Sequence, residues 1–262
     1  MEYGFTRPTE VIETEQMAKG SDLHLARELS SEEYVDVKVE SNEDIFAIKA
    51  LNLYSHMKNL STLKMSREVP IFGWIGKLFL MGKIDELRYD DETKTIHICE
   101  FKTRKKRFLP GAAQQKTHKL QLMIYQYLLT NFQETDPEVL AKMMKLDASK
   151  VLGKDVQKHC PSKVKTIHDL LLLTKQLPKV EISKLIIEYS CQDKDEVFAT
   201  TEEKYDERWL LENVKCFEEY WFGGRFAQGV DIEEAWKCQM CSFADNCEWR
   251  IAKANELTNR KS

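Results

Sequence analysis

The residues of this chain whose types best suit catalysis are two acids and a lysine, Asp85, Glu100 and Lys102. Successive side chains of a β-strand alternate between its two faces, so Glu100 and Lys102 should project together from one strand. A turn centred between Glu92 and Thr93 would place Asp85 directly opposite Glu100 on the neighbouring antiparallel strand. Directly opposed residues share a face, with Cβ atoms about 4.5–5.5 Å apart. The three side chains are therefore predicted to lie together.

Two carboxylates at that separation can hold a hard cation such as Mg²⁺ or Mn²⁺. Lys102 beside them can orient or deprotonate a water at the metal and stabilise the negative charge of a pentacovalent phosphate. This arrangement predicts metal-dependent hydrolysis of phosphodiester bonds. The alternative is a set of cross-strand ion pairs on the sheet surface. A register slip of one residue would move Asp85 to the opposite face.

Four cations follow the second strand directly, namely Arg104, Lys105, Lys106 and Arg107. Beside a hydrolytic site, such a run predicts contacts with the phosphates of a nucleic-acid strand. The alternative is a solvated loop whose charges serve only solubility.

Gln121 and Tyr125 are four residues apart in a helix pattern, so they share one helix face. An amide and a phenol on that face can hydrogen-bond the substrate or the attacking water. The alternative for Tyr125 is ordinary helix packing.

The elements that would position these residues are helices and strands in alternation. We predict a helix from Ser41, with Asp44 three residues on, to about Leu60. Strands should run from Leu78 to Leu87 and from Thr95 to Lys102, with a second hairpin over 180–190 and 197–201. Further helices should cover 112–132, begin at Asp136-Pro137, and run from 204 to 222 before Gly223-Gly224. This order predicts one mixed α/β domain.

Composition limits the class of protein. The 262 residues are 42% hydrophobic, so a packed core is expected and extensive disorder is not. The formal net charge of −4 means that any affinity for nucleic acid must come from a local basic patch. The sequence has neither a secretory signal nor an apolar run of about 20 residues, so we expect no membrane contact.

Five of the candidate residues occur in the order and spacing of the PD-(D/E)xK nuclease core of the RecB-like branch: Asp85, Glu100, Lys102, Gln121 and Tyr125. His24, in the helix-like segment 20–29, resembles the upstream histidine motif of that branch. The resemblance implies that His24 joins Asp85 and Glu100 at the metal centre. It also implies a restriction-endonuclease-like fold, a mixed central sheet flanked by helices.

The C-terminal tail carries Cys238, Cys241 and Cys247 in a C-x2-C-x5-C pattern. In a reducing compartment, three thiolates this close predict a zinc ion or an iron–sulfur cluster. Flanking aromatic residues, Trp236 and Trp249 among them, could shield such a cluster from solvent. The alternative is three unrelated buried cysteines.

The tail resembles that of the exonuclease V family, RecB-like enzymes with a 4Fe–4S cluster. The resemblance extends from segment 20–24 to segment 247–250, and 229–238 is an especially close match. It implies a single-strand-specific DNA exonuclease of genome maintenance, with the cluster fastening the C-terminus to the nuclease core. From the order of segments along the chain we predict one domain over 1–262: core motifs at 20–130, a lysine-rich helical insertion at about 133–178, a second hairpin and helix at 179–224, and a cluster-binding tail at 229–250.

The family has a further cluster cysteine upstream, shortly before a pair that Tyr3-Gly4 resembles. This departure leads us to expect a shortened chain that lacks the fourth cluster ligand and is weakly active. Four other cysteines are poor substitutes because they fall on predicted strands, turns, helices or the insertion: Cys99, Cys160, Cys191 and Cys216.

We therefore expect a monomeric exonuclease that uses Mg²⁺ or Mn²⁺, acts on single-stranded DNA in the nucleus, and has a single-strand-binding protein as a candidate partner. One rival is another RecB-like nuclease, such as the iron–sulfur nucleases of CRISPR adaptation. The other is a non-catalytic nucleic-acid-binding module whose cysteines hold zinc or an iron–sulfur cluster and whose acids are structural.

Overall fold

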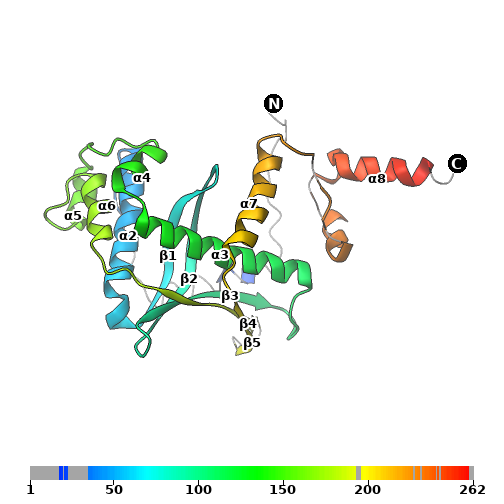
Figure 1. Cartoon of the computed structure of the whole chain (residues 1–262), viewed down its shortest axis with the longest axis horizontal. Helices are drawn as coiled ribbons and strands as arrows, with labels where there is room; N and C mark the ends of the chain where they lie inside the picture. Colours follow the sequence, from blue (N-terminus) through cyan, green and yellow to red (C-terminus); the bar gives the residue numbers. More distant parts are fainter. Residues whose placement is uncertain are drawn as a thin grey trace.

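A mixed sheet forms the centre of the molecule in the computed structural model, which describes residues 18–19, 21–22, 35–192, 196–226, 228–230, 232–239, 241 and 243–259. The described strands lie in the order β1-β2-β3-β4-β5 (Figure 1). Their bounds are β1 (Met65–Ile75), β2 (Leu78–Asp90), β3 (Thr95–Arg104), β4 (Ile182–Cys191) and β5 (Glu196–Glu203). Only β3 and β4 pair in parallel; the other neighbours are antiparallel. The predicted α/β class is confirmed.

The β2–β3 hairpin has the turn that the sequence predicts. The antiparallel pairing ends at Asp90 and Thr95, and the Asp90 carboxylate accepts hydrogen bonds from the amides of Glu92 and Thr93. Lys94 then takes a left-handed conformation with φ 58°. An aspartate that accepts bonds from amides two and three residues on is a common way to fix a tight turn. The turn therefore fixes the register of both strands.

Capping residues start the helices where the sequence predicts. The Ser41 hydroxyl accepts the Asp44 N–H at the start of α2 (Asn42–Leu63). Asp136 caps α4 (Pro137–Met143) in the same way, and the proline occupies its first turn. The long helix α3 (Ala112–Glu134) and the helix α7 (Glu207–Trp221) agree with the predicted 112–132 and 204–222.

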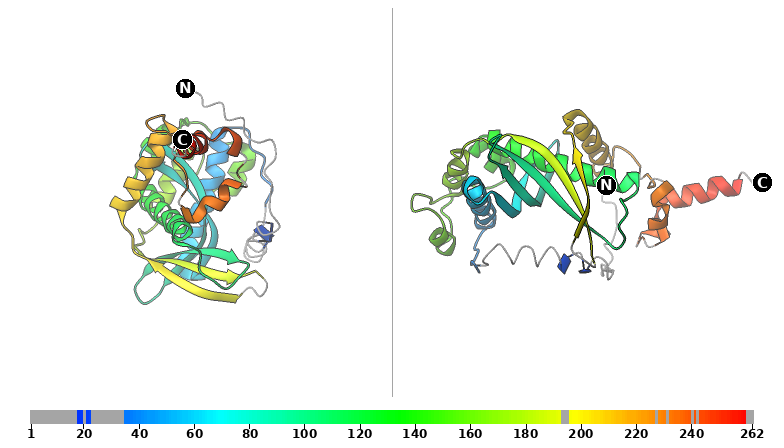
Figure 2. Two further views of the ribbon diagram at one scale, coloured as in Figure 1. Left: turned by 90° about the vertical axis from the view of Figure 1, so that its right-hand side faces the viewer. Right: turned by 90° about the horizontal axis from the view of Figure 1, so that it is seen from below.

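The core lies between the sheet and the helices α2 and α3. Figure 2 shows α3 running along one face of the sheet with α2 beside β1. Phe72 of β1 meets Phe46 of α2 and Phe132 of α3 edge-on, with ring centroids 5.8 Å and 5.4 Å apart. Edge-to-face aromatic pairs add to the stabilisation from burial alone. These contacts fix α3, and with it the face that carries Gln121, against the sheet.

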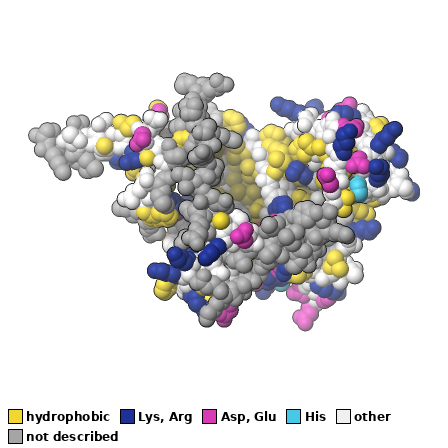
Figure 3. Space-filling model, turned by 180° about the vertical axis from the view of Figure 1, so that it is seen from behind, with side chains coloured by type: hydrophobic (Ala, Val, Ile, Leu, Met, Phe, Trp, Pro, Cys, Tyr) yellow, Lys and Arg dark blue, Asp and Glu magenta, His cyan; other side chains and the backbone are white. Residues whose placement is uncertain are grey.

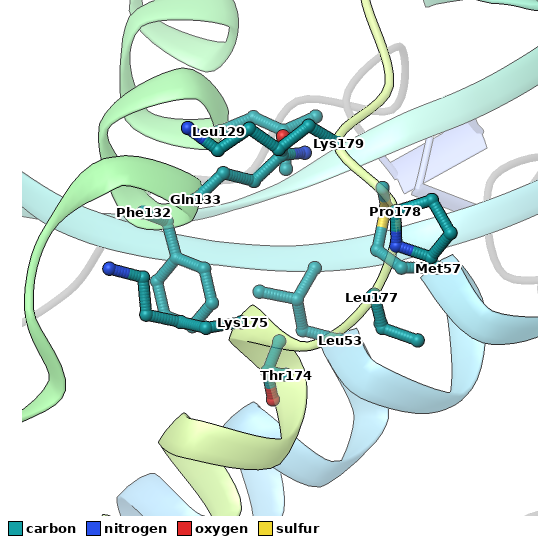
Figure 4. A pocket seen from close by; sticks show the side chains of 10 residues that line it. All are labelled: Leu53, Met57, Leu129, Phe132, Gln133, Thr174, Lys175, Leu177, Pro178 and Lys179. Atoms are coloured by element: carbon teal, nitrogen blue, oxygen red, sulfur yellow. The ribbon is translucent and has the colours of Figure 1, made fainter.

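A small cavity of about 20 Å³ lies where α2 and α3 meet the segment 174–179 (Figure 4). Side chains of Leu53, Phe132 and Leu177 line it. The volume suits a water molecule at most, so this seam is a packing joint and not a ligand site.

The segment 133–178 packs onto α2 as part of the core. It contains α4, α5 (Lys154–His159) and α6 (Ile167–Lys175), with irregular stretches between them. Asp44 accepts the Gly153 N–H at 2.7 Å, and a Cβ at Gly153 would lie 2.9 Å from the same carboxylate. Figure 3 shows many Lys and Arg side chains over this end of the molecule. The predicted helices are present, and their apolar faces join the main core.

Strand β1 was not predicted, because its sequence does not alternate. Ile71 and Phe72 are both buried, although neighbouring strand residues normally face opposite sides. Gly73 lets Leu128 of α3 approach to within 3.2 Å of the position that a Cβ would occupy. Pro70 is tolerated because β1 is an edge strand of the described sheet.

The C-terminal segment leaves the sheet after α7. Gly223, with φ 77°, follows that helix as predicted. The tail comprises the 3₁₀ helices η1 (Ile232–Gln239) and η2 (Ala244–Asn246) and the unpredicted helix α8 (Glu248–Asn259). Figures 1 and 2 show α8 extending away from the sheet. No helix in the described part of the chain is long and apolar enough to cross a membrane.

Candidate active site

Asp85 and Glu100 lie side by side on β2 and β3. The last backbone pair of the hairpin is Glu86 with Cys99, so one further step places Asp85 opposite Glu100. At that step the Asp85 carboxylate replaces the backbone pairing: its Oδ2 accepts the Phe101 N–H at 2.7 Å. This bond ties the Asp85 side chain to the strand that carries Glu100. The structure thus places the two acids as the turn position predicts.

Lys102 links the sheet to α3. Its Nζ donates to Glu100 Oε1 at 2.5 Å and to Gln121 Oε1 at 3.0 Å. Glu100 is only 2% exposed, and a buried carboxylate stays ionised at reasonable cost only when a cation or several donors face it. The lysine and the glutamine, distant in sequence, therefore form part of one polar cluster with the acids.

Tyr125 completes this cluster one helical turn beyond Gln121. The Gln121 amide donates to the Tyr125 hydroxyl at 2.9 Å. The ring lies over Gly82 of β2, where an added Cβ would be 3.1 Å from the ring, so a side chain at that position would crowd the tyrosine. Burial and, next, the charge of Glu100 raise the pKa of the Tyr125 phenol. The phenol is therefore protonated at neutral pH and can donate its O–H.

The fit of this site to a divalent cation rests on the chemistry of its donors. Carboxylate oxygens of Asp85 and Glu100 suit Mg²⁺ or Mn²⁺, which prefer hard oxygen ligands. Within the described ranges, no group of three or more His, Cys, Asp or Glu side chains is placed to hold a metal ion. His24, expected as a third ligand, lies outside the described residues. The described part of the site thus offers two candidate ligands, Asp85 and Glu100.

The predicted cationic run leaves the end of β3 beside this cluster. Lys105, Lys106 and Arg107 are exposed, and Arg107 pairs with Glu196 at 3.1 Å on the surface. Exposed pairs of this kind contribute little stability, so phosphates can replace the carboxylate. Phe108, directly after the run, is 69% exposed. Sequence reasoning missed this residue, although an aromatic beside four cations is a signal for stacking on single-stranded bases.

Of the three tail cysteines, Cys238 lies in η1, Cys241 lies between η1 and η2, and Cys247 directly follows η2. Cys238 and Cys247 are half-buried and Cys241 is exposed. The described residues do not gather them into a set of metal ligands. Trp236, expected to shield a cluster, is 55% exposed, whereas Trp249 packs closely against Gly229. The three thiols are thus near one another along the chain, and the part of the tail that the structure describes does not arrange them as a metal site.

The other cysteines lie in the body of the molecule. Cys99 is buried on β3, where burial raises the pKa of its thiol to about 12. Burial also raises the pKa of the Cys160 thiol. Metal ligation needs the thiolate, so a raised thiol pKa disfavours these two positions as ligands.

Comparison with known proteins gives matches along most of the chain. The model of a family described as exonuclease V, a 5′ deoxyribonuclease, matches residues 1–95, 90–172 and 160–250. These ranges include all candidate residues named above. Exonuclease V of Danio rerio is 34% identical over 242 residues, which cover 88% of this chain and 61% of that protein. The chain thus spans about three fifths of the length of this curated relative.

Among solved structures, the crystal structure of SSO0001 is matched over 79% of this chain and 69% of that chain. The identity is 17% and the TM-score is 0.34, so this similarity carries no argument about fold or function.

Proposed function

The chain belongs to the exonuclease V family, and from this premise we propose that it hydrolyses phosphodiester bonds of single-stranded DNA from a 5′ end, with Mg²⁺ or Mn²⁺ at Asp85 and Glu100. The observation that carries the proposal is one continuous polar cluster. Asp85 is bonded to the backbone beside Glu100, Glu100 to Lys102, and Lys102 through Gln121 to Tyr125. A mere surface ion pair would need neither the buried glutamate nor the helix contacts.

We assign the core to the PD-(D/E)xK type on the same grounds. Acids on two adjacent antiparallel strands, a lysine two residues after the second acid, and a parallel strand on the far side of β3 support this assignment. Gln121 and Tyr125 on α3 support the RecB-like branch.

A divalent cation bound by the two acids would polarise the phosphate and increase the acidity of a water molecule. Lys102 donates hydrogen bonds to two oxygens, which is the behaviour of an ammonium group. We therefore assign Lys102 to stabilising the charge that develops on the phosphate, in preference to removing a proton. The protonated Tyr125 phenol and the Gln121 amide orient Lys102 and can bond the substrate.

The strand itself is held, in this proposal, by the cationic run and by Phe108. Arg104 to Arg107 would contact phosphates, and the exposed Phe108 ring would stack on a base. Such contacts favour a single strand because its bases are free to stack.

For the tail we propose a 4Fe–4S cluster held by Cys238, Cys241 and Cys247, on the chemistry of three closely spaced thiols. Because the described residues do not group these thiols, no step of the hydrolysis is assigned to the cluster. Visible absorption from sulfur-to-iron charge transfer would distinguish the cluster from zinc. A role in DNA repair, a nuclear location, a monomeric state and a single-strand-binding protein as partner remain part of the proposal.

Digestion of single-stranded DNA labelled at either end tests the activity. With Mg²⁺, a 5′ label should appear at once in short products, while a 3′-labelled strand should shorten progressively. Duplex DNA of the same sequence should resist. The Asp85→Ala chain, matched in concentration, is the control. Metal-dependent binding without any cleavage would instead indicate a non-catalytic nucleic-acid-binding module.

A further inference from the structure

Glu68 lies on β1 at a break in the pairing with β2. The antiparallel register runs through Arg67 with Glu86 and resumes at Val69 with Ile84, omitting the position at which Glu68 faces Asp85. Glu68 has φ 48°, in the left-handed region. Three carboxylates therefore occupy successive strands at one level of the sheet: Glu68, Asp85 and Glu100.

The conformation of Glu68 is costly for a residue with a side chain. Non-glycine residues avoid the left-handed region and keep it only where the surrounding structure holds them there. Such breaks in a sheet ladder often redirect a side chain beside an active site. The Glu68 carboxylate lies 3.7 Å from the ammonium group of the half-exposed Lys83.

Two further observations place the Glu68 carboxylate beside the candidate site. Its negative charge acts, with those of Glu100 and Asp85, to raise the pKa of the Tyr125 phenol. Glu68 also lines a pocket of about 580 Å³ between α2 and β1, together with His56, Arg67 and Lys83. The carboxylate, only 14% exposed, thus lies close enough to the cluster to act on Tyr125 electrostatically, and beside a space that water can enter.

We propose that Glu68 is a positioning residue of the active site, whose carboxylate accepts hydrogen bonds from the water molecules around the cation held by Asp85 and Glu100. This inference rests on the proposed function. Magnesium keeps several of its waters when it binds a protein, and carboxylates outside the direct ligand set commonly hold them. Glu68 does not complete a direct three-ligand group with the other two acids in the described structure, so it acts through water.

The test measures Mn²⁺ binding by calorimetry and cleavage of single-stranded DNA in the same variants. Glu68→Gln keeps the size of the side chain and removes its charge. We expect it to weaken Mn²⁺ binding by about tenfold and to lower kcat by a similar factor, the usual effect of removing such a group. The KM for DNA should not change, because Glu68 is not assigned to the strand.

Three matched variants separate this role from a structural one. Glu68→Gly suits φ 48° and should raise or keep the unfolding temperature while losing Mn²⁺ affinity as Glu68→Gln does. Lys83→Gln breaks the same ion pair and should not weaken Mn²⁺ binding. Glu134→Gln breaks a remote pair of equal length, 3.7 Å to Lys179, and should match the parent.

The outcomes also separate this inference from the proposed function. If the parent binds Mn²⁺ and cleaves DNA, Asp85→Ala does neither, and Glu68→Gln matches the parent, the role of Glu68 is wrong and the nuclease stands. The role of Glu68 is equally wrong if Lys83→Gln reproduces the loss of Mn²⁺ affinity. If the parent itself neither binds Mn²⁺ nor cleaves, both proposals fail.

Discussion

At the scale of single residues, Lys102 has an observed ion pair with Glu100 and a proposed catalytic role, and mutation can separate the two. The Lys102 ammonium group forms an ion pair with the buried Glu100. In the proposed function, the same group also faces the phosphate of the substrate. Removing one partner of a buried ion pair leaves an uncompensated charge, which costs more than removing both partners. Loss of activity alone therefore does not distinguish a catalytic lysine from one that keeps Glu100 ionised and in place.

The first prediction concerns this pair. Lys102→Met should lower kcat by about 10²–10³, the usual effect of losing a group that stabilises transition-state charge. It should also lower the free energy of unfolding by about 3 kcal/mol, because Glu100 is left buried without its cation. Lys102→Met combined with Glu100→Gln should recover most of that stability and none of the activity. Denaturant unfolding and single-turnover cleavage measure the two quantities. Recovery of activity in the double variant would remove Lys102 from the mechanism.

The second prediction concerns His118 on α3, whose Nδ1 lies 3.2 Å from the buried Tyr189 hydroxyl. Burial, then the charges of Lys102 and Arg104, lowers the pKa of His118 from 6.5 to about 4. Between pH 6.5 and 4, the His118 imidazole is therefore protonated in the unfolded chain but neutral in the folded chain. Above this pH window His118 does not reduce the free energy of unfolding. As the pH falls through the window, the free energy of unfolding decreases by on the order of 3 kcal/mol.

The variant His118→Gln should flatten the pH dependence of the unfolding free energy between pH 6.5 and 4, compared with the parent. The exposed His159→Gln is the matched control and should leave the slope unchanged. Equal slopes in the parent and His118→Gln would mean that His118 titrates normally in the folded protein.

At the scale of elements, the loop between β3 and α3 is the part of the structure best placed to hold a strand. It begins directly after Arg104, the last residue of β3, and carries the three cations Lys105, Lys106 and Arg107 and the exposed aromatic ring of Phe108. Because the loop starts at the strand that bears Glu100, a nucleic-acid backbone bound there would, under the proposed function, lie close to the two acids. Phosphate contacts and base stacking should differ in how the affinity for single-stranded DNA depends on salt and on removal of the side chains.

The third prediction separates these contributions. Neutralising Arg104, Lys105, Lys106 and Arg107 to glutamine should weaken binding to all single strands alike. Each lost phosphate contact should reduce the slope of log affinity against log salt by about 0.7. Phe108→Ala should weaken binding by about 1–3 kcal/mol and leave that slope unchanged. Fluorescence anisotropy with catalytically inactive Asp85→Ala protein measures both. An unchanged slope after neutralisation would identify the run as a solvated loop.

The elements also show why part of the site could be predicted and part could not. Asp85, Glu100 and Lys102 lie on a hairpin whose alternation and turn are local signals, so their meeting follows from the sequence. The contact of Lys102 with Gln121 depends on how α3 packs across the sheet, which Phe72 and Phe132 decide. Strand β1 lacks alternation because both of its faces are partly buried, and a break at Glu68 interrupts it. No local sequence pattern indicates that break, so sequence reasoning did not identify Glu68.

At the scale of the whole molecule, the chain divides into a packed body and a projecting tail. The buried apolar core of the described residues runs from Ala47 to Val214 and includes nothing from η1, η2 or α8. Figure 2 shows α8 pointing away from the sheet. The three cysteines therefore lie on a segment that does not contribute to the packing of the body. A cluster bound there should consequently have little effect on the stability of the body.

The last prediction follows from that separation. Iron–sulfur reconstitution without oxygen should give the chain visible charge-transfer absorption, and Cys238→Ser, Cys241→Ser or Cys247→Ser should each reduce it strongly. Cys216→Ser on α7 is the control and should retain the colour. Because cluster formation would draw the three thiols together, the loaded tail should resist proteolysis near Trp236, which is exposed in the described structure. The unfolding temperature of the body, followed by far-ultraviolet circular dichroism, should change little between loaded and unloaded protein. A large loss of body stability on removing iron would mean that the tail docks on the sheet when the cluster is bound.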